Sequence, residues 1–221
     1  MLRSVPVFEV VAALLLERLR RLGYAERLVL MRASVIGQRF NIEVLGPATP
    51  IPDGRLRTAL DILCSLEFVV RDEANTDCYA FRHALIWKIA YEECVATGLR
   101  PIHRKITRAL ECQYAGDDSK LGDLAYHAWA AGDAARSMRY NELAGDRARG
   151  SFAHDEARSY YERARAFARP NSRHYRRLGR KLYALTEGVP VAPGTQTEER
   201  QSSSRRDSST RSLPAVRWTP R

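Results

Sequence analysis

The chain has 221 residues, of which 45% are hydrophobic and 28% are charged, and these values exclude a wholly disordered protein. Its formal net charge of +10 is concentrated near one end, because residues 171–221 hold eleven Lys or Arg against four acidic residues. Residues 1–170 carry a net charge of only +3, so a broad phosphate-binding face on the folded core is not expected.

Hydrophobic periodicity predicts a helical N-terminal region. Apolar residues recur every three or four positions over 7–22, the spacing of one helix face, and Gly23 ends that helix. A second helix is predicted over 25–36 and a short third over 42–45, after which Gly and Pro residues in 47–54 indicate a break. A fourth helix is predicted by the spacing of Leu56, Leu60, Leu63 and Leu66.

Two short apolar segments follow, separated by a polar turn. Residues 68–71 and 78–81 are rich in aromatic and β-branched side chains, and residues 72–77 form the turn between them, which is the pattern of a β-hairpin. Several helices followed by a hairpin is the order of elements in a winged helix. We therefore expect a winged-helix-like domain over residues 1–98.

The chain returns to helical periodicity after the hairpin and shows no further strand signal. Helices are predicted near 83–97, 101–114, 120–131, 134–149 and 154–168. The last two combine small and aromatic residues, a pattern that lets antiparallel helices pack closely and is typical of tetratricopeptide-like repeats. The residues concerned are Met138, Tyr140, Ala144, Ala157, Tyr160, Tyr161 and Ala164. The copies are only 20 residues apart, short of a repeat period of roughly 34, so the repeat is degenerate.

The C-terminal part divides into a helical-repeat segment, residues 99–186, and a tail. A further helix face is formed by Tyr175, Leu178, Leu182 and Leu185. Residues 187–221 are rich in Pro, Ser, Thr and Arg with few apolar residues, which predicts a disordered basic tail. The expected fold class is therefore mainly α: a winged-helix-like domain with a small β-hairpin, a tetratricopeptide-like helical array and a disordered tail.

The cysteine spacing and the apolar run near the start of the chain indicate the compartment in which the protein is expected. Neighbouring cysteines are 14, 16 and 18 residues apart, without the close pair that seeds a zinc or redox motif, and they predict buried thiols of a reduced, cytoplasmic protein. They are Cys64, Cys78, Cys94 and Cys112. The apolar run 10–16 is flanked by Glu9 and Glu17 and is followed by no cleavage site, so neither a signal peptide nor a membrane span is expected.

Catalytic constellations are not found in the sequence. No Gly is followed by Lys, as a phosphate-binding loop requires, and no Ser or Cys lies on a nucleophile elbow. Cys94 and His103 could meet across the turn at 98–101, but a buried thiol and a surface histidine is the favoured interpretation. A metal site built from Cys78, His83 and Cys94 has no recognisable ligand spacing. We therefore expect no enzyme activity, no cofactor and no metal.

DNA binding through the winged helix is an alternative function. The recognition helix would span about 56–65 and would offer Arg55 and Arg57, but also Asp61 and a largely apolar surface. The expected wing tip is acidic and would repel phosphate, since it contains Asp72, Glu73 and Asp77. Nucleic acid is thus a disfavoured partner, with the basic tail as a second route to it.

Three segments together resemble the region that follows the nucleotide-binding core in bacterial signal-transduction ATPases with numerous domains, the STAND ATPases. They are RLVLMRASVIGQRF at 27–40, the stretch 60–81, and FRHALIWKIAYE at 81–92, which is the most specific. The resemblance covers roughly residues 5–168 and is closest to forms linked to adenylate or guanylate cyclase and LuxR-type regulators. It implies a winged helix followed by tetratricopeptide-like repeats.

The resemblance also implies a role for His83. In that family the nucleotide lies between the ATPase core and the winged helix, and a histidine at the start of the helix after the hairpin reaches the bound diphosphate. His83 is at the matching position, where an imidazole beside free backbone amides suits phosphate. Ala84 departs from the aspartate that commonly follows this histidine in plant immune receptors. The alternative is that Phe81, Ala84, Leu85, Ile89 and Tyr91 are core residues and His83 only caps the helix.

The resemblance implies that residues 1–6 correspond to the point where the ATPase core would end, so we expect this core to be absent from the chain. We therefore expect a non-catalytic regulatory and protein-interaction module that gates an ATPase core or cyclase domain in trans. His83 would contact a nucleotide phosphate only together with such a partner, and the helical repeats would bind protein. The alternative is a DNA-binding transcriptional regulator. No membrane partner is expected.

Overall fold

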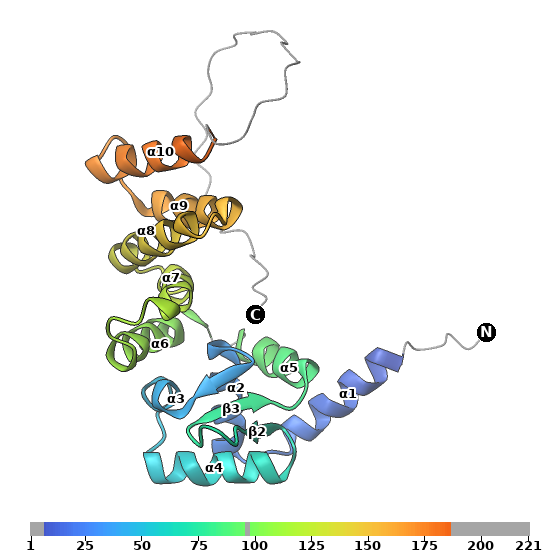
Figure 1. Cartoon of the computed structure of the whole chain (residues 1–221). Helices are drawn as coiled ribbons and strands as arrows, with labels where there is room; N and C mark the ends of the chain where they lie inside the picture. Colours follow the sequence, from blue (N-terminus) through green and yellow to red (C-terminus); the bar gives the residue numbers. More distant parts are fainter. Residues whose placement is uncertain (1–6, 96–97, 187–221) are drawn as a thin grey trace, which may run out of the picture.

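The structure is a computed structural model, and it describes residues 7–95 and 98–186. Its described part is mainly helical with one small antiparallel sheet, which confirms the expected fold class (Figure 1). The tail predicted to be disordered, residues 187–221, lies outside the described residues. Within the described part, no helix is long and apolar enough to cross a membrane.

The N-terminal region combines five helices with three short strands. The helices are α1 (Val7–Arg20), α2 (Tyr24–Ile36), α3 (Ile42–Ala48), α4 (Asp53–Ser65) and α5 (Ala84–Val95). The strands are β1 (Arg39–Asn41), β2 (Val69–Arg71) and β3 (Cys78–Phe81), with β3 in the middle and antiparallel to both others. From α2 to β3 the order is helix, strand, two helices and two strands, which is the topology of a winged helix with α4 at the recognition-helix position.

The predicted hairpin is confirmed as β2 and β3, whereas β1 was not predicted. Phe40 of β1 stacks on Tyr79 of β3, with ring centroids 5.7 Å apart, so this short strand is held by aromatic burial. The break expected from residue 47 begins later, because α3 includes Pro47 and ends at Ala48. Helix α3 packs against α6, and this tertiary contact outweighs the weak helix propensity of Gly46 and Pro47.

Large aliphatic and aromatic side chains fill the core of this region. Every predicted core leucine of α4 except Leu66, which is 42% exposed at the helix end, is buried against α2 and the sheet. Trp87 of α5 donates its indole N–H to the carbonyl of Ser34 at 2.8 Å and so ties α5 to α2. The hairpin and α5 are thereby fixed relative to each other, which determines where His83 lies.

The C-terminal region is an array of antiparallel helices. They are α6 (Arg100–Gln113), α7 (Leu121–Ala130), α8 (Ala134–Gly150), α9 (His154–Phe167) and α10 (Arg173–Thr186), with a short 3-10 helix η1 (Asp118–Lys120) before α7. Four were expected within a few residues of these bounds, and α10 was expected from the apolar face within 175–185. Polar contacts join α6 to α8 and α8 to α10, while Arg163 of α9 lies over the ring of Trp129 of α7. Alternate helices therefore form two layers.

The expected close packing of small residues against aromatics is confirmed between α8 and α9. A Cβ atom added to Gly145 would lie 2.5 Å from the Tyr161 ring, so only glycine permits this helix separation. The Tyr161 ring is fully buried, and its hydroxyl donates to Asp146 at 2.7 Å. Gly145 and Tyr161 thus set the geometry of the array.

A shared core connects the two regions. Met31 and Val35 of α2 and Val44 of α3 belong to the same buried cluster as Ile102 and Ile106 of α6. This cluster lies on both sides of position 98, the domain boundary expected from the sequence, and the division there remains a prediction. The winged helix and the first array helices are consequently in direct apolar contact.

Candidate functional site

His83 directly precedes α5 and is exposed to solvent. Its backbone carbonyl accepts hydrogen bonds from the amides of Ile86 and Trp87, at 3.0 and 3.3 Å, so the residue is at the helix N-cap position. Among the described residues its imidazole makes no hydrogen bond or ion pair. The exposed imidazole is therefore on the residue that precedes the first-turn amides of Ala84 and Leu85, which have no intrahelical partner, an arrangement compatible with an anion.

The surroundings of His83 bear on the interpretation that this segment only builds the core. Phe81 and Ile89 are buried and Leu85 and Tyr91 are half-buried, as that interpretation expects, but Ala84 is exposed, so its expected core role was wrong. Arg82 is exposed and lies 3.6 Å from Glu67, a weak surface ion pair. The ring of His83 does not cap α5 itself, because only its carbonyl bonds the helix amides.

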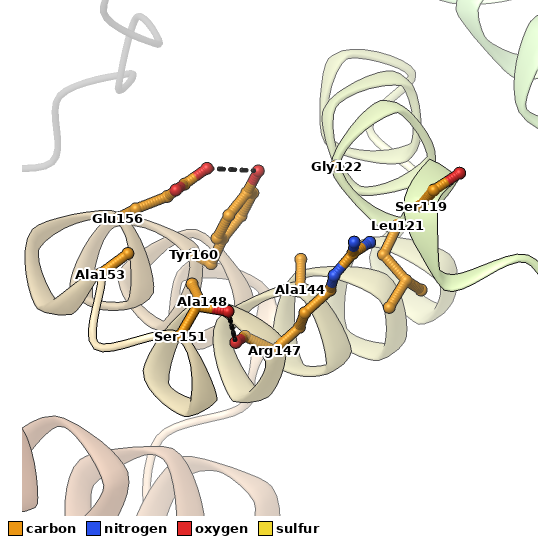
Figure 2. A pocket seen from close by; sticks show the side chains of 10 residues that line it. All are labelled: Ser119, Leu121, Gly122, Ala144, Arg147, Ala148, Ser151, Ala153, Glu156 and Tyr160. Carbon is orange, nitrogen blue, oxygen red and sulfur yellow. Dashed lines mark hydrogen bonds between the residues drawn. The ribbon is translucent and has the colours of Figure 1, made fainter.

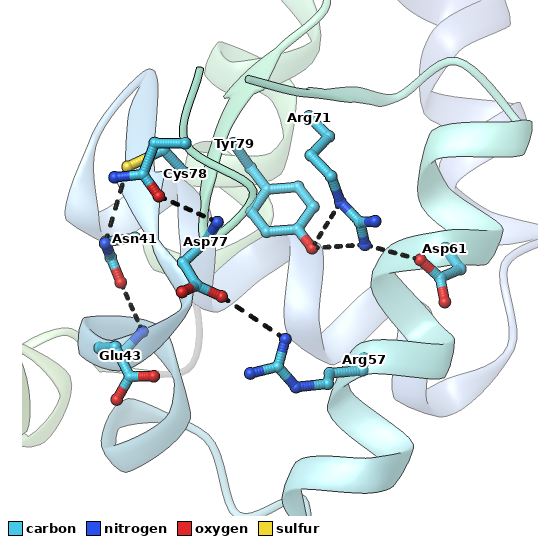
Figure 3. Close-up of polar contacts among 9 residues, drawn as sticks. Asn41, Glu43, Arg57, Asp61, Arg71, Asp77, Cys78 and Tyr79 are labelled. Carbon is cyan, nitrogen blue, oxygen red and sulfur yellow. Dashed lines mark hydrogen bonds and ion pairs between the residues drawn. The ribbon is translucent and has the colours of Figure 1, made fainter. Parts of the chain in front are cut away.

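The winged-helix face that could read DNA has most of its charges paired internally (Figure 3). Arg57 of α4 lies 3.6 Å from Asp77 of the wing, and Arg39 of β1 lies 2.6 Å from Asp72. These pairs neutralise the cations that a phosphate backbone would need. Arg55 is exposed on α4 and has no ion-pair partner among the described residues.

Arg71 of β2 is held in the same network. Its guanidinium donates to the Tyr79 hydroxyl at 2.8 Å and to Asp61 of α4 at 2.9 Å. Figure 3 shows this arginine bridging the sheet and the helix. The side chain therefore connects α4 to the wing, although it stays 43% exposed.

A pair of buried histidines lies where the two regions meet. The Nδ1 atoms of His103 on α6 and His127 on α7 are 2.8 Å apart, and both side chains are at most 2% exposed. The carbonyl of Ile36 at the end of α2 acts on the ring of His127 and partly offsets the lowering of its pKa by burial.

This environment keeps both rings neutral. Burial lowers the pKa of His103 to about 4. Burial, followed by the proximity of His103, lowers the pKa of His127 well below its ordinary value. The expectation that His103 is a surface residue was wrong, whereas Cys94 is buried as expected. His103 lies on the apolar face of α6 with Ile102 and Ile106, and this spacing could have revealed its burial.

Two hollows lie on opposite sides of α8. One, of about 280 Å³, lies between α7, α8 and α9 (Figure 2), and its polar residues contact each other: Tyr160 lies 3.4 Å from Glu156, and Arg147 donates to the carbonyl of Asp118. The other is a groove of about 660 Å³ between α8 and α10. The first offers a ligand little unsatisfied polar surface, whereas Arg139 and Arg177 line the groove.

The residues considered as metal ligands do not form a site. Cys78 is in β3 and receives a hydrogen bond from the Asn41 side chain at 3.6 Å, whereas His83 is exposed before α5 and Cys94 is buried in the shared core. In the described ranges 7–95 and 98–186, no three His, Cys, Asp or Glu side chains gather as a metal site.

Comparison with protein-family models, curated proteins and solved structures finds no match for this chain.

Proposed function

We propose that the protein is a non-catalytic regulatory module that gates a nucleotide-bound partner domain through its winged helix and binds protein through its helical array. The observation that carries the proposal is the position of His83, exposed beside the free amides of α5 in a winged-helix topology. A bound diphosphate presented by a partner would receive hydrogen bonds from the imidazole and from these amides. The module would act in the cytoplasm, where nucleotides are present.

The surface of α1 supports a protein partner. Helix α1 packs against α5, yet three of its aliphatic side chains point outward: Val10, Val11 and Leu14 are 45, 41 and 62% exposed. The C-terminal end of α1 is held at the end of α4, because Arg18 donates to the carbonyl of Leu66 at 2.9 Å. An apolar helix face on the element that supports α5 suits contact with a second domain.

The experiment supplies the partner in trans. The purified chain is added to the nucleotide-binding core of a bacterial signal-transduction ATPase that lacks its own winged helix, and release of fluorescent ADP is followed. We expect release to slow by about fivefold or more, the usual range for coupling between two sites. His83→Ala should remove this effect. His154→Ala is the matched control, because His154 is also exposed at the start of a helix, α9.

Two outcomes would count against the proposal. Equal slowing by wild type and His83→Ala would show that the imidazole takes no part. Calorimetric binding of ADP to the chain alone with micromolar affinity would contradict the interpretation that a nucleotide needs a partner domain, since the sequence contains no phosphate-binding loop.

DNA binding is a second candidate, favoured by the winged-helix topology and by exposed Arg55 on α4. It predicts affinity that falls steeply with salt. Deleting residues 187–221 separates its two routes, because loss of all affinity would exclude readout by the winged helix. Retained affinity that Arg55→Ala abolishes would instead favour this candidate over gating.

A further inference from the structure

The groove between α8 and α10 has an apolar floor. Met138 is half-buried and Leu143 is 41% exposed at this groove, and the small side chain of Ala135 also lines it. Its volume of about 660 Å³ is large enough for several side chains of a bound segment. The exposed aliphatic surface in a concave place indicates a site for an apolar anchor.

The carboxylates of the groove are already satisfied within the protein. Glu142 pairs with Arg177 and with Lys181, the latter at 2.8 Å. Asp146 accepts from Lys181 and from the hydroxyl of Tyr161, both at 2.7 Å. These groups therefore offer little to a cationic ligand, and they hold Arg177 and Lys181 in place.

Two arginines around the groove remain without an ion pair. Arg139 lines it and Arg173 is the first residue of α10, and neither has an ion-pair partner among the described residues. Residues 134–186 carry thirteen Lys or Arg against five Asp or Glu, whereas residues 7–95 carry eleven against twelve. The positive charge of the described structure is thus concentrated on α8, α9 and α10, and α8 and α10 form the groove.

We propose that the groove between α8 and α10 binds an acidic peptide segment of a partner protein, with an apolar side chain of the peptide inserted between Met138 and Leu143. This names the partner class for the array and so rests on the proposed protein-binding function. The chain's own residues 187–221 do not fit, because they hold six Arg against four acidic residues. A nucleic acid would leave the apolar floor unused.

The test measures binding of fluorescein-labelled 12-residue peptides to the full chain by anisotropy. One peptide is rich in Glu with two Leu anchors, a second replaces Leu by Ser, a third replaces Glu by Lys, and a fourth probe is an oligothymidylate. The acidic Leu peptide should bind with a dissociation constant on the order of 10–100 µM. The Ser and Lys peptides should bind at least about tenfold more weakly, since each lacks one of the two complementary features.

Two variants locate the site. Arg139→Glu and Leu143→Ser should each weaken binding of the acidic peptide by about five- to tenfold, since both side chains are exposed at the groove. Arg158→Glu is the matched control, because it makes the same charge change on the exposed face of α9 and should alter binding less than about twofold.

Each contrary result has a definite meaning. Equal loss with Arg158→Glu, equal binding of the Ser peptide, or absence of saturable binding would overturn the groove proposal. Tighter binding of oligothymidylate than of the acidic peptide would overturn it in favour of nucleic acid. None of these results affects the ADP-release experiment, which depends on His83, so the two proposals fail separately.

Discussion

The two regions of the molecule are stabilised in different ways. The winged helix buries large side chains such as Leu60, Leu63 and Phe68, and its buried polar residues are the neutral Ser34 and Thr49. The array buries small residues against aromatic rings, and its buried polar residues include two histidines. An apolar core tolerates exchanges that conserve side-chain volume, whereas close helix approach and buried polar pairs depend on individual atoms. Substitutions and acid should therefore affect the array first.

The largest expected difference is the response to acid. His103 and His127 bind a proton less readily in the folded protein than in the unfolded chain. The free energy of unfolding therefore decreases as the pH falls from about 6.5 toward 4, because only the unfolded chain takes up these protons. Between pH 7 and pH 5, His103 should cost roughly 2 kcal/mol of unfolding free energy, and His127 should lower it further in the same direction. Urea unfolding at the two pH values measures the loss.

Histidine ring 15N shifts separate this effect from general acid unfolding. Both rings should remain neutral at pH 5.5, and the double variant His103→Gln, His127→Gln should show a flatter dependence of stability on pH. His154→Asn changes an exposed histidine of α9 and should keep the wild-type dependence. A charged ring at position 103 or 127 in the folded protein at pH 5.5 would contradict the assignment.

The second difference concerns glycine. Gly145→Ala places a methyl group 2.5 Å from the Tyr161 ring and should destabilise the array by about 2–3 kcal/mol through overpacking. Gly179→Ala in α10 is the control, since its added Cβ meets nothing within 4 Å and should stabilise by about 0.5–1 kcal/mol. Hydrogen exchange should accelerate at α8 and α9 amides but not at those of α4. Uniform acceleration would mean that the two regions unfold together.

The sequence predicted those elements whose signal is local. Spacing of apolar residues located the helices of the array, and the polar turn between two aliphatic and aromatic segments located the hairpin. Strand β1 was missed because its three residues are too few to show alternation, and its pairing with β3 lies about 40 positions away in the chain. Helix α3 was cut short because Pro47 was interpreted without its packing on α6.

The candidate sites were predictable to different degrees. His83 could be located because a short motif lies at a fixed place after the hairpin. The His103 and His127 pair could not, because two helices must be placed side by side before their rings meet. The groove likewise depends on how α10 returns along α8, which apolar spacing within one helix does not specify.

The smallest expected effect is that of a glycine substitution at one helix end in each region. Glu67 after α4 and Phe152 after α8 both have φ near +60° in the same C-terminal motif, in which the next amide bonds the carbonyl five residues earlier. Glycine removes the strain of this conformation, so each substitution should stabilise. Phe152→Gly should gain about 0.5–1 kcal/mol, because the ring is 82% exposed. Glu67→Gly should gain less, since it also removes the contact with Arg82. Urea unfolding ranks the two, and a larger gain at position 67 would mean that this surface pair contributes nothing.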